Sequence, residues 1–259
     1  FLMSHDSDEF NRWQSAQDYA MRILIGAVRA LRKGQRPARP DGFLGALAAM
    51  LNETGLEPAY VAQVLAVPSE SDVARVMARD VDPALIHRAR RWLRKTMATQ
   101  LGTHLIEIYE SGSGSRRFSP DAKSAGARAL RIAALSLLAA RGQPADVERA
   151  ARHFRNASNA TDEIGALAIL STLNGPERSD ALDRFYARWK DDHLVLNSWF
   201  AFQAAAPLAA TLRTVKHLTT HPQFSMRNPN NVYSLIGAFA GSNPLQFNRP
   251  DGKGYDFVA

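Results

Sequence analysis

The stretch DPALIHRARRWLRKTMATQLGTHLIEIYE, residues 82–110, decides the fold class. Asp82 followed by Pro83 is a helix start signal, because the carboxylate can accept from free backbone N–H groups and proline has no N–H to lose. Apolar residues then recur at helical spacing. The predicted apolar face contains Leu85, Ala89, Trp92, Leu93, Leu101, Leu105 and Ile108, and the other face carries Arg88, Arg90, Arg91, Arg94 and Lys95. We expect one long helix that ends near Glu110.

The same 3.6-residue period continues on both sides of this stretch. Asp6 with Glu9 resembles a capping box, Ser69 and Asp72 can cap another helix, and Ser119-Pro120 repeats the cap-then-proline start. Later helices are expected at about 144–156, 161–174, 177–190, 194–206 and 208–220. No sustained alternation of apolar and polar residues predicts a strand. We therefore predict an all-α fold, a right-handed superhelix of about 12 helices stacked as antiparallel pairs, which is an α-solenoid of the HEAT or armadillo type.

Composition bounds the class of protein. The 259 residues contain no cysteine, which excludes disulfides, thiolate nucleophiles and cysteine-based zinc sites. No apolar run approaches the roughly 20 residues of a membrane-spanning helix, and a cytoplasmic location fits. Both ends look like cuts through a longer polypeptide, so we expect residues 1–259 to be a single helical domain, truncated at both ends, of a larger protein.

The sequence contains no recognisable motif for catalysis or metal binding. The seven histidines form no H-E-x-x-H pair. His217 and His221 are four residues apart, but Pro222 ends the helix, so both are interpreted as histidines near a helix C-terminus. The glycines of GSGSRRF, residues 112–118, are interpreted as a surface loop and not as a phosphate cradle. The adjacent acids of DEIG (162–165) and KDD (190–192) are interpreted as solvated faces. We expect no catalytic residue and no metal ligand in this chain.

Two further stretches carry alternatives. The net charge of +7 and the basic run HRARRWLRK, residues 87–95, suggest nucleic-acid binding as an alternative function. We interpret Trp92 as core and the arginines as the rim of the helix, and so expect neither a nucleic-acid nor a membrane partner. LVLNSWFAFQAAAP, residues 194–207, is almost wholly apolar around Asn197, Ser198 and Gln203, and its buried asparagine and glutamine need partners. They could face a polar cavity, but we favour their pinning the neighbouring backbone.

The tail NPNNVYSLIGAFAGSNPLQFN, residues 228–248, resembles a short helix capped at both ends. Asn228 or Asn230 can cap its N-terminus, Gly241 can stop it, and Asn243-Pro244 can start the next turn. Gly237 would permit the close approach of another helix.

Residues 220–257, THPQFSMRNPNNVYSLIGAFAGSNPLQFNRPDGKGYDF, resemble the C-terminal domain of bacterial aminopeptidase N, in the alanyl aminopeptidase group of zinc metallopeptidases. The matching motif residues are His221, Phe224, Asn228, Pro229, Asn230, Leu235, Ile236, Gly237, Phe239, Asn243, Pro244, Gly254 and Tyr255. DEFNRWQSAQ, NATDEIGALAIL and WFAFQAAAP are similar to the same domain, so the resemblance covers essentially the whole chain.

The resemblance implies a non-catalytic role inside a zinc enzyme that removes N-terminal amino acids from peptides. The family holds zinc with H-E-x-x-H and a distal glutamate on a catalytic domain, and neither motif is in this sequence. The chain would cap that domain, its partner in the same polypeptide, and restrict the access of peptide substrates. Asn228, Asn230, Asn231 and Tyr233 are the candidates for the cavity rim, although relatives often carry arginine at position 231 or 233. His221, Phe224, Pro229, Gly237, Phe239, Asn243 and Pro244 would be structural. The alternative hypothesis is a free-standing α-solenoid module that binds peptides or proteins.

Overall fold

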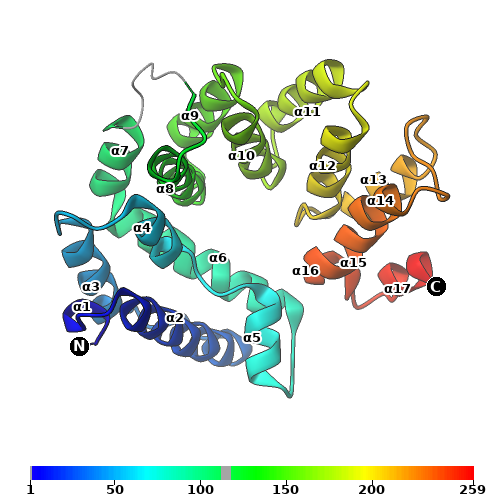
Figure 1. Ribbon diagram of the computed structural model, residues 1–259. Helices are drawn as coiled ribbons and strands as arrows, with labels where there is room; N and C mark the ends of the chain where they lie inside the picture. The colour runs from blue at the N-terminus through cyan, green and yellow to red at the C-terminus, as the bar shows by residue number, and fades with distance from the viewer. Residues whose placement is uncertain (1, 112–117) are drawn as a thin grey trace. The chain divides into compact units, whose positions relative to one another are not determined.

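The computed structural model describes residues 2–111 and 118–259, and all regular structure in these ranges is helical, as predicted (Figure 1). The GSGSRRF loop lies, except for Phe118, outside the described residues. The helices are α1 (Leu2–His5), α2 (Glu9–Arg32), α3 (Asp41–Leu51), α4 (Pro58–Leu65), α5 (Glu70–Met77), α6 (Pro83–Gln100), α7 (Gly102–Ser111), α8 (Ala122–Ala139), α9 (Pro144–Arg155), α10 (Ala160–Ser171), α11 (Pro176–Trp189), α12 (His193–Ala204), α13 (Thr211–Leu218), α14 (Pro229–Val232), the π-helix η1 (Tyr233–Gly237), α15 (Ala238–Ser242), α16 (Pro244–Phe247) and α17 (Lys253–Val258).

The number of helices agrees with the prediction of about 12. Twelve helices, α2 to α13, have eight or more residues in the described ranges, and α14, η1 and α15 form one more continuous run. None of the helices in the ranges 2–111 and 118–259 is long and apolar enough to cross a membrane.

Two compact units divide the chain, residues 1–146 and 147–259. In the first unit α2 packs beside α6, and α4, α6 and α7 pack against α8. In the second unit α10 to α13 pack on one another in chain order, and α12 also packs on η1 and α15. This stacking of consecutive helices is that of a helical solenoid. The right-handed superhelix and the single domain stay predictions.

The prediction of one long helix over residues 83–110 is wrong, because the segment forms two helices, α6 and α7. α6 ends at Gln100, Leu101 leaves the helical conformation (φ −96°, ψ 11°), and α7 begins at Gly102. A Cβ on Gly102 would lie 2.9 Å from Nη1 of Arg141. The arginine in turn donates from Nε and Nη2 to the fully buried carboxylate of Asp146, at 2.7 Å each. A distant ion pair therefore occupies the space beside the break.

The basic face of α6 is not only a rim, which corrects the interpretation of its arginines. Nε of Arg90 donates to the carbonyl of Pro68 at 2.6 Å, and Nη2 of Arg94 donates to the carbonyl and hydroxyl oxygens of Ser136 at 3.0 and 2.7 Å. Burial lowers the pKa of Arg94 to about 10. These two arginines fasten α6 to its neighbours, and Trp92, predicted as core, is only half-buried.

Two predicted caps of the first unit are confirmed. Asp82 accepts from the backbone N–H groups of Ala84 and Leu85 at 2.9 and 3.1 Å. Ser69 and Asp72 form a capping box at the start of α5. Such caps fix where a helix starts because they satisfy its first free donors.

Two other predicted caps are wrong by two residues. Asp8 and not Asp6 caps α2, accepting from N–H of Asn11 at 3.0 Å, while Asp6 accepts from N–H of Asp8. Asp121 and not Ser119 caps α8. In both places a short-side-chain acceptor two residues further on has the extended backbone that a cap needs.

Helix α8 approaches α4 closely at Gly126, and this contact predicts a position-specific effect. A Cβ built on Gly126 would lie 3.1 Å from the backbone N of Ala59 and 3.2 Å from its Cβ. Gly126→Leu should therefore lower the free energy of unfolding by about 1–3 kcal/mol through overpacking.

The matched control is Gly26→Leu, also inside a helix, where nothing lies within 4 Å of the built Cβ. This substitution should raise the free energy of unfolding by about 0.5–1 kcal/mol through helix propensity. Urea unfolding followed by circular dichroism measures both. A Gly126→Leu variant as stable as Gly26→Leu would contradict the close α4–α8 contact.

Candidate functional site

The tail stretch forms one continuous helical run from Pro229 to Ser242, capped by asparagine at each end. Asn228 accepts from N–H of Asn230 at 3.0 Å, and Asn243 accepts from N–H of Gln246 at 3.2 Å to start α16. Both caps were predicted. The predicted stop at Gly241 is wrong, because Gly241 lies inside α15 and the helix ends at Asn243 (φ −128°, ψ 64°).

The middle of this run, Tyr233–Gly237, is a π-helix. Such segments are rare and occur frequently at functional sites. The prediction that Gly237 admits a neighbouring helix is wrong. The three atoms nearest to a Cβ built there all belong to Tyr233 and Val232 of its own run, at 3.5–3.8 Å.

A group of side-chain hydrogen bonds joins the tail run to α12. Oδ1 of Asn197 accepts from Nδ2 of Asn231 at 2.8 Å and from the hydroxyl of Ser234 at 3.2 Å. Oδ1 of Asn231 accepts from N–H of Ser225 at 3.0 Å. Asn197 therefore pins a neighbouring segment, as predicted, and we call Asn197, Asn231 and Ser234 the amide cluster.

A second asparagine holds the end of the run. Asn243 is 2% exposed, and its Nδ2 donates to the carbonyls of Ala204 and Ala206 at 2.9 and 2.8 Å. The carbonyl of Ala204 belongs to the last turn of α12, where no further helical N–H follows. The carbonyl of Ala206 also accepts from the N–H of Leu208 and from the hydroxyl of Thr211. Gln203, also predicted to pin backbone, donates to the carbonyl of Trp199 at 3.2 Å within α12.

His221 lies just beyond the C-terminal end of α13, as predicted, and its backbone N–H donates to the carbonyl of Leu218 at 3.1 Å. The prediction missed that the His221 ring lies inside an aromatic group. Its ring centroid lies 5.2 Å from Tyr186, 5.5 Å from Trp199 and 5.7 Å from Phe200. Nδ1 accepts from N–H of Gln223 at 3.1 Å, so the neutral ring carries its proton on Nε2. Burial, with a smaller effect of His217, lowers the pKa of His221.

Other motif residues have structural surroundings. Phe239 is fully buried, with its ring against Phe247 and Phe257. Phe224 contacts Phe200 with centroids 5.8 Å apart. Pro229 and Pro244 occupy the first positions of α14 and α16.

The four candidate rim residues divide into two kinds. Asn231 is 5% exposed and Asn228 is half-buried, and the side chains of both are engaged as described above. Asn230 is exposed, and the Tyr233 side chain is 75% exposed. Because these two are three residues apart on one helical run, they share a face. We call Asn230 and Tyr233 the Tyr233 surface.

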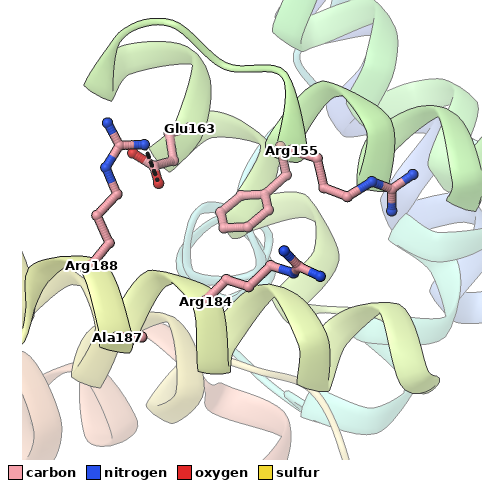
Figure 2. A pocket seen from close by; sticks show the side chains of 6 residues that line it. Arg155, Glu163, Arg184, Ala187 and Arg188 are labelled. Atoms are coloured by element: carbon pink, nitrogen blue, oxygen red, sulfur yellow. Dashed lines mark hydrogen bonds and ion pairs between the residues drawn. The ribbon is translucent and has the colours of Figure 1, made fainter.

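A pocket of about 450 Å³ lies elsewhere in the second unit, between α9, α10 and α11 (Figure 2). It is lined by Phe154, Arg155, Glu163, Arg184, Ala187 and Arg188. Glu163 is 4% exposed and accepts from Nε1 of Trp189 at 3.2 Å, so its interpretation as a solvated acid is wrong. Sequence reasoning missed the pocket because its arginines come from different helices and form no run.

No group of three or more His, Asp or Glu side chains in the ranges 2–111 and 118–259 could hold a metal ion. The residues that the structure does bring together are amides, aromatic rings and arginines. Such an arrangement can bind and position other groups.

Comparison with known proteins gives a family match over the whole chain. The model described as "Domain of unknown function (DUF3458_C) ARM repeats" matches residues 1–259. The chain is 38% identical over 258 residues to aminopeptidase N of Caulobacter vibrioides, and 35% identical over 259 residues to that of Escherichia coli. It spans 29% of the length of each of these relatives.

A solved structure has the same fold. The crystal structure of Legionella pneumophila aminopeptidase A, in complex with aspartic acid, matches with a TM-score of 0.86 and 27% identity. The match covers 99% of this chain and 30% of that one.

The amide cluster predicts different effects for two neighbouring asparagines. Asn231→Ala removes a hydrogen bond to Asn197 and leaves the N–H of Ser225 without its acceptor. The free energy of unfolding should fall by about 1–3 kcal/mol. Asn230→Ala, in the same run but exposed, should change it by less than about 0.5 kcal/mol. Thermal unfolding of both variants is the measurement, and equal stability would show that the cluster contributes nothing.

Proposed function

The chain belongs to the armadillo-repeat family described as DUF3458_C and corresponds to the C-terminal domain of bacterial aminopeptidase N; from this premise we propose that it is the non-catalytic part of a zinc-dependent aminopeptidase. The parent enzyme would remove N-terminal amino acids from peptides. The observation that carries the proposal is a match over the whole chain that spans 29% of each relative. The rest of the relatives' length leaves room for the peptidase chemistry.

Zinc would be held outside this chain. The described residues do not fit a zinc site, since they offer no group of three potential ligands. The role left for these residues is to position the substrate, to exclude water and large substrates, and to bind other parts of the protein.

The role that we propose is to cap the catalytic domain and to limit the access of peptides to the zinc. A wall of this kind must hold its shape, because a mobile rim would admit larger substrates. The Tyr233 surface has that support. In the chain, Tyr233 lies between Asn231 and Ser234 of the amide cluster, which both hydrogen-bond to Asn197 on α12. The run ends at Asn243, which donates to the carbonyl of Ala204 at the end of α12. Closure of a site also excludes water and strengthens the electrostatic interactions inside it.

Within this proposal, Asn230 and Tyr233 would meet the peptide at the rim. Asn228 and Asn231 would act as positioning residues, since their side chains are engaged within the protein. A cytoplasmic location is part of the same proposal and rests on the absence of cysteine.

The test is size selectivity in the full-length enzyme. Tyr233→Ala should change kcat/KM for peptides of about ten residues by about threefold or more, because longer peptides must pass the rim. For an aminoacyl chromogenic amide, which is small, the change should stay under about twofold. Steady-state kinetics on a series of peptides of increasing length measures the trend.

Val76→Ala is the control, because Val76 is also exposed, at 53%, but lies in the first unit on α5. It should leave both kinds of substrate unaffected. Equal effects of Tyr233→Ala on short and long substrates, or no effect on either, would overturn the assignment of the rim.

A further inference from the structure

The pocket between α9, α10 and α11 has an unusual lining for its size. Three of its six residues are arginines, Arg155 at the end of α9 and Arg184 and Arg188 on α11, and Glu163 on α10 is its single acid. Phe154, 5% exposed, and Ala187 add an apolar part. A volume of about 450 Å³ is within the range of small-molecule sites.

Glu163 and Arg188 form one side of the pocket. Nη1 of Arg188 donates to Oε1 of Glu163 at 3.4 Å, while Oε2 accepts from Trp189. The buried carboxylate is thereby compensated inside the protein. Figure 2 shows the Arg188 side chain directed at Glu163.

Arg155 and Arg184 form the other side. Figure 2 shows that they come from two helices and that both guanidinium groups lie on the side away from Glu163 and Arg188. Arg155 uses Nη2 in its contact with Glu148, at 2.6 Å. Arg184 uses Nε in its contacts with Asp180, at 2.8 and 2.9 Å. Each of these contacts uses one of the three guanidinium nitrogens, which leaves the other two nitrogens of each pocket-lining arginine for further hydrogen bonds.

The carboxylates that pair with these two arginines do not prevent a ligand from binding to them. The side chains of Glu148 and Asp180 are 55% and 45% exposed, and ion pairs of such exposure contribute about 0–1 kcal/mol. A ligand can therefore share or replace them. A singly charged ion would gain little over these acids, so the site favours a ligand with two or more negative charges.

We propose that Arg155 and Arg184 form the binding site of a compact oxyanion with at least two negative charges, either a phosphate or a dicarboxylate. The planar guanidinium group offers parallel N–H donors that match the oxygens of both groups. Glu163 has a positioning role, since it holds Arg188 and Trp189 on the far side of the pocket. This site does not depend on the proposed function, because its geometry lies wholly within residues 148–189.

The experiment is equilibrium dialysis of the full-length polypeptide at low ionic strength, with radiolabelled inorganic phosphate in one arm and glutarate in the other. Arg155→Gln/Arg184→Gln should weaken the binding of the preferred anion by about tenfold or more. The arm with the tighter binding identifies phosphate or carboxylate as the ligand chemistry.

The matched control is Arg213→Gln/Arg227→Gln, which removes the same charge from two exposed arginines outside the pocket. Its effect should stay under about twofold. The proposal is overturned if neither anion binds in a way that depends on the pocket arginines, or if both pairs of substitutions weaken binding equally, because the effect would then be one of net charge. Peptidase activity is not the readout, so the outcome is separate from that of the rim experiment.

Discussion

Buried amide groups must be hydrogen-bonded, and this constraint shapes the second unit. Asn231 and Asn243 are almost fully buried at either end of the tail run, and each bonds to α12 or to the residues just after it. An unpaired buried amide costs about 1–3 kcal/mol, so the run has little freedom to slide along α12. The position of Tyr233, two residues after Asn231, follows from these bonds. The asparagines of the tail thus need no catalytic role to explain them.

Helix type and order were predictable from the sequence because they depend on local signals. The 3.6-residue period, the Asp82-Pro83 start and the Ser69–Asp72 capping box all act within a few residues. The break at Leu101 was missed, although Gly102 weakens a helix locally. The side chain that lies beside Gly102 belongs to Arg141, some forty residues later, and this contact could not be predicted. The same holds for Arg94, whose partner Ser136 lies on α8. Long-range contacts thus account for these two features, whereas the misplaced caps of α2 and α8 depend on local choices between acceptors two residues apart.

The tail run and the arginine pocket also differ in how far local sequence signals predict them. The tail motif was visible as a stretch, and the caps at Asn228 and Asn243 follow from residue type and position. Which asparagine is exposed depends on packing, and sequence could not separate Asn230 from Asn231. The arginine pocket had no local signal, since α9 supplies Arg155 and α11 supplies Arg184. Its buried acid, Glu163, sits next to a carboxylate in the chain and was interpreted as solvated for that reason.

The central claim is that this chain supports a zinc aminopeptidase without carrying its chemistry. The most direct measurement compares the 259-residue chain with the full-length polypeptide that contains it. Zinc content and hydrolysis of an alanine chromogenic amide are measured for both under the same conditions. The account predicts zinc and turnover in the full-length protein and neither in the chain by itself. Turnover or stoichiometric zinc in the isolated chain would contradict it.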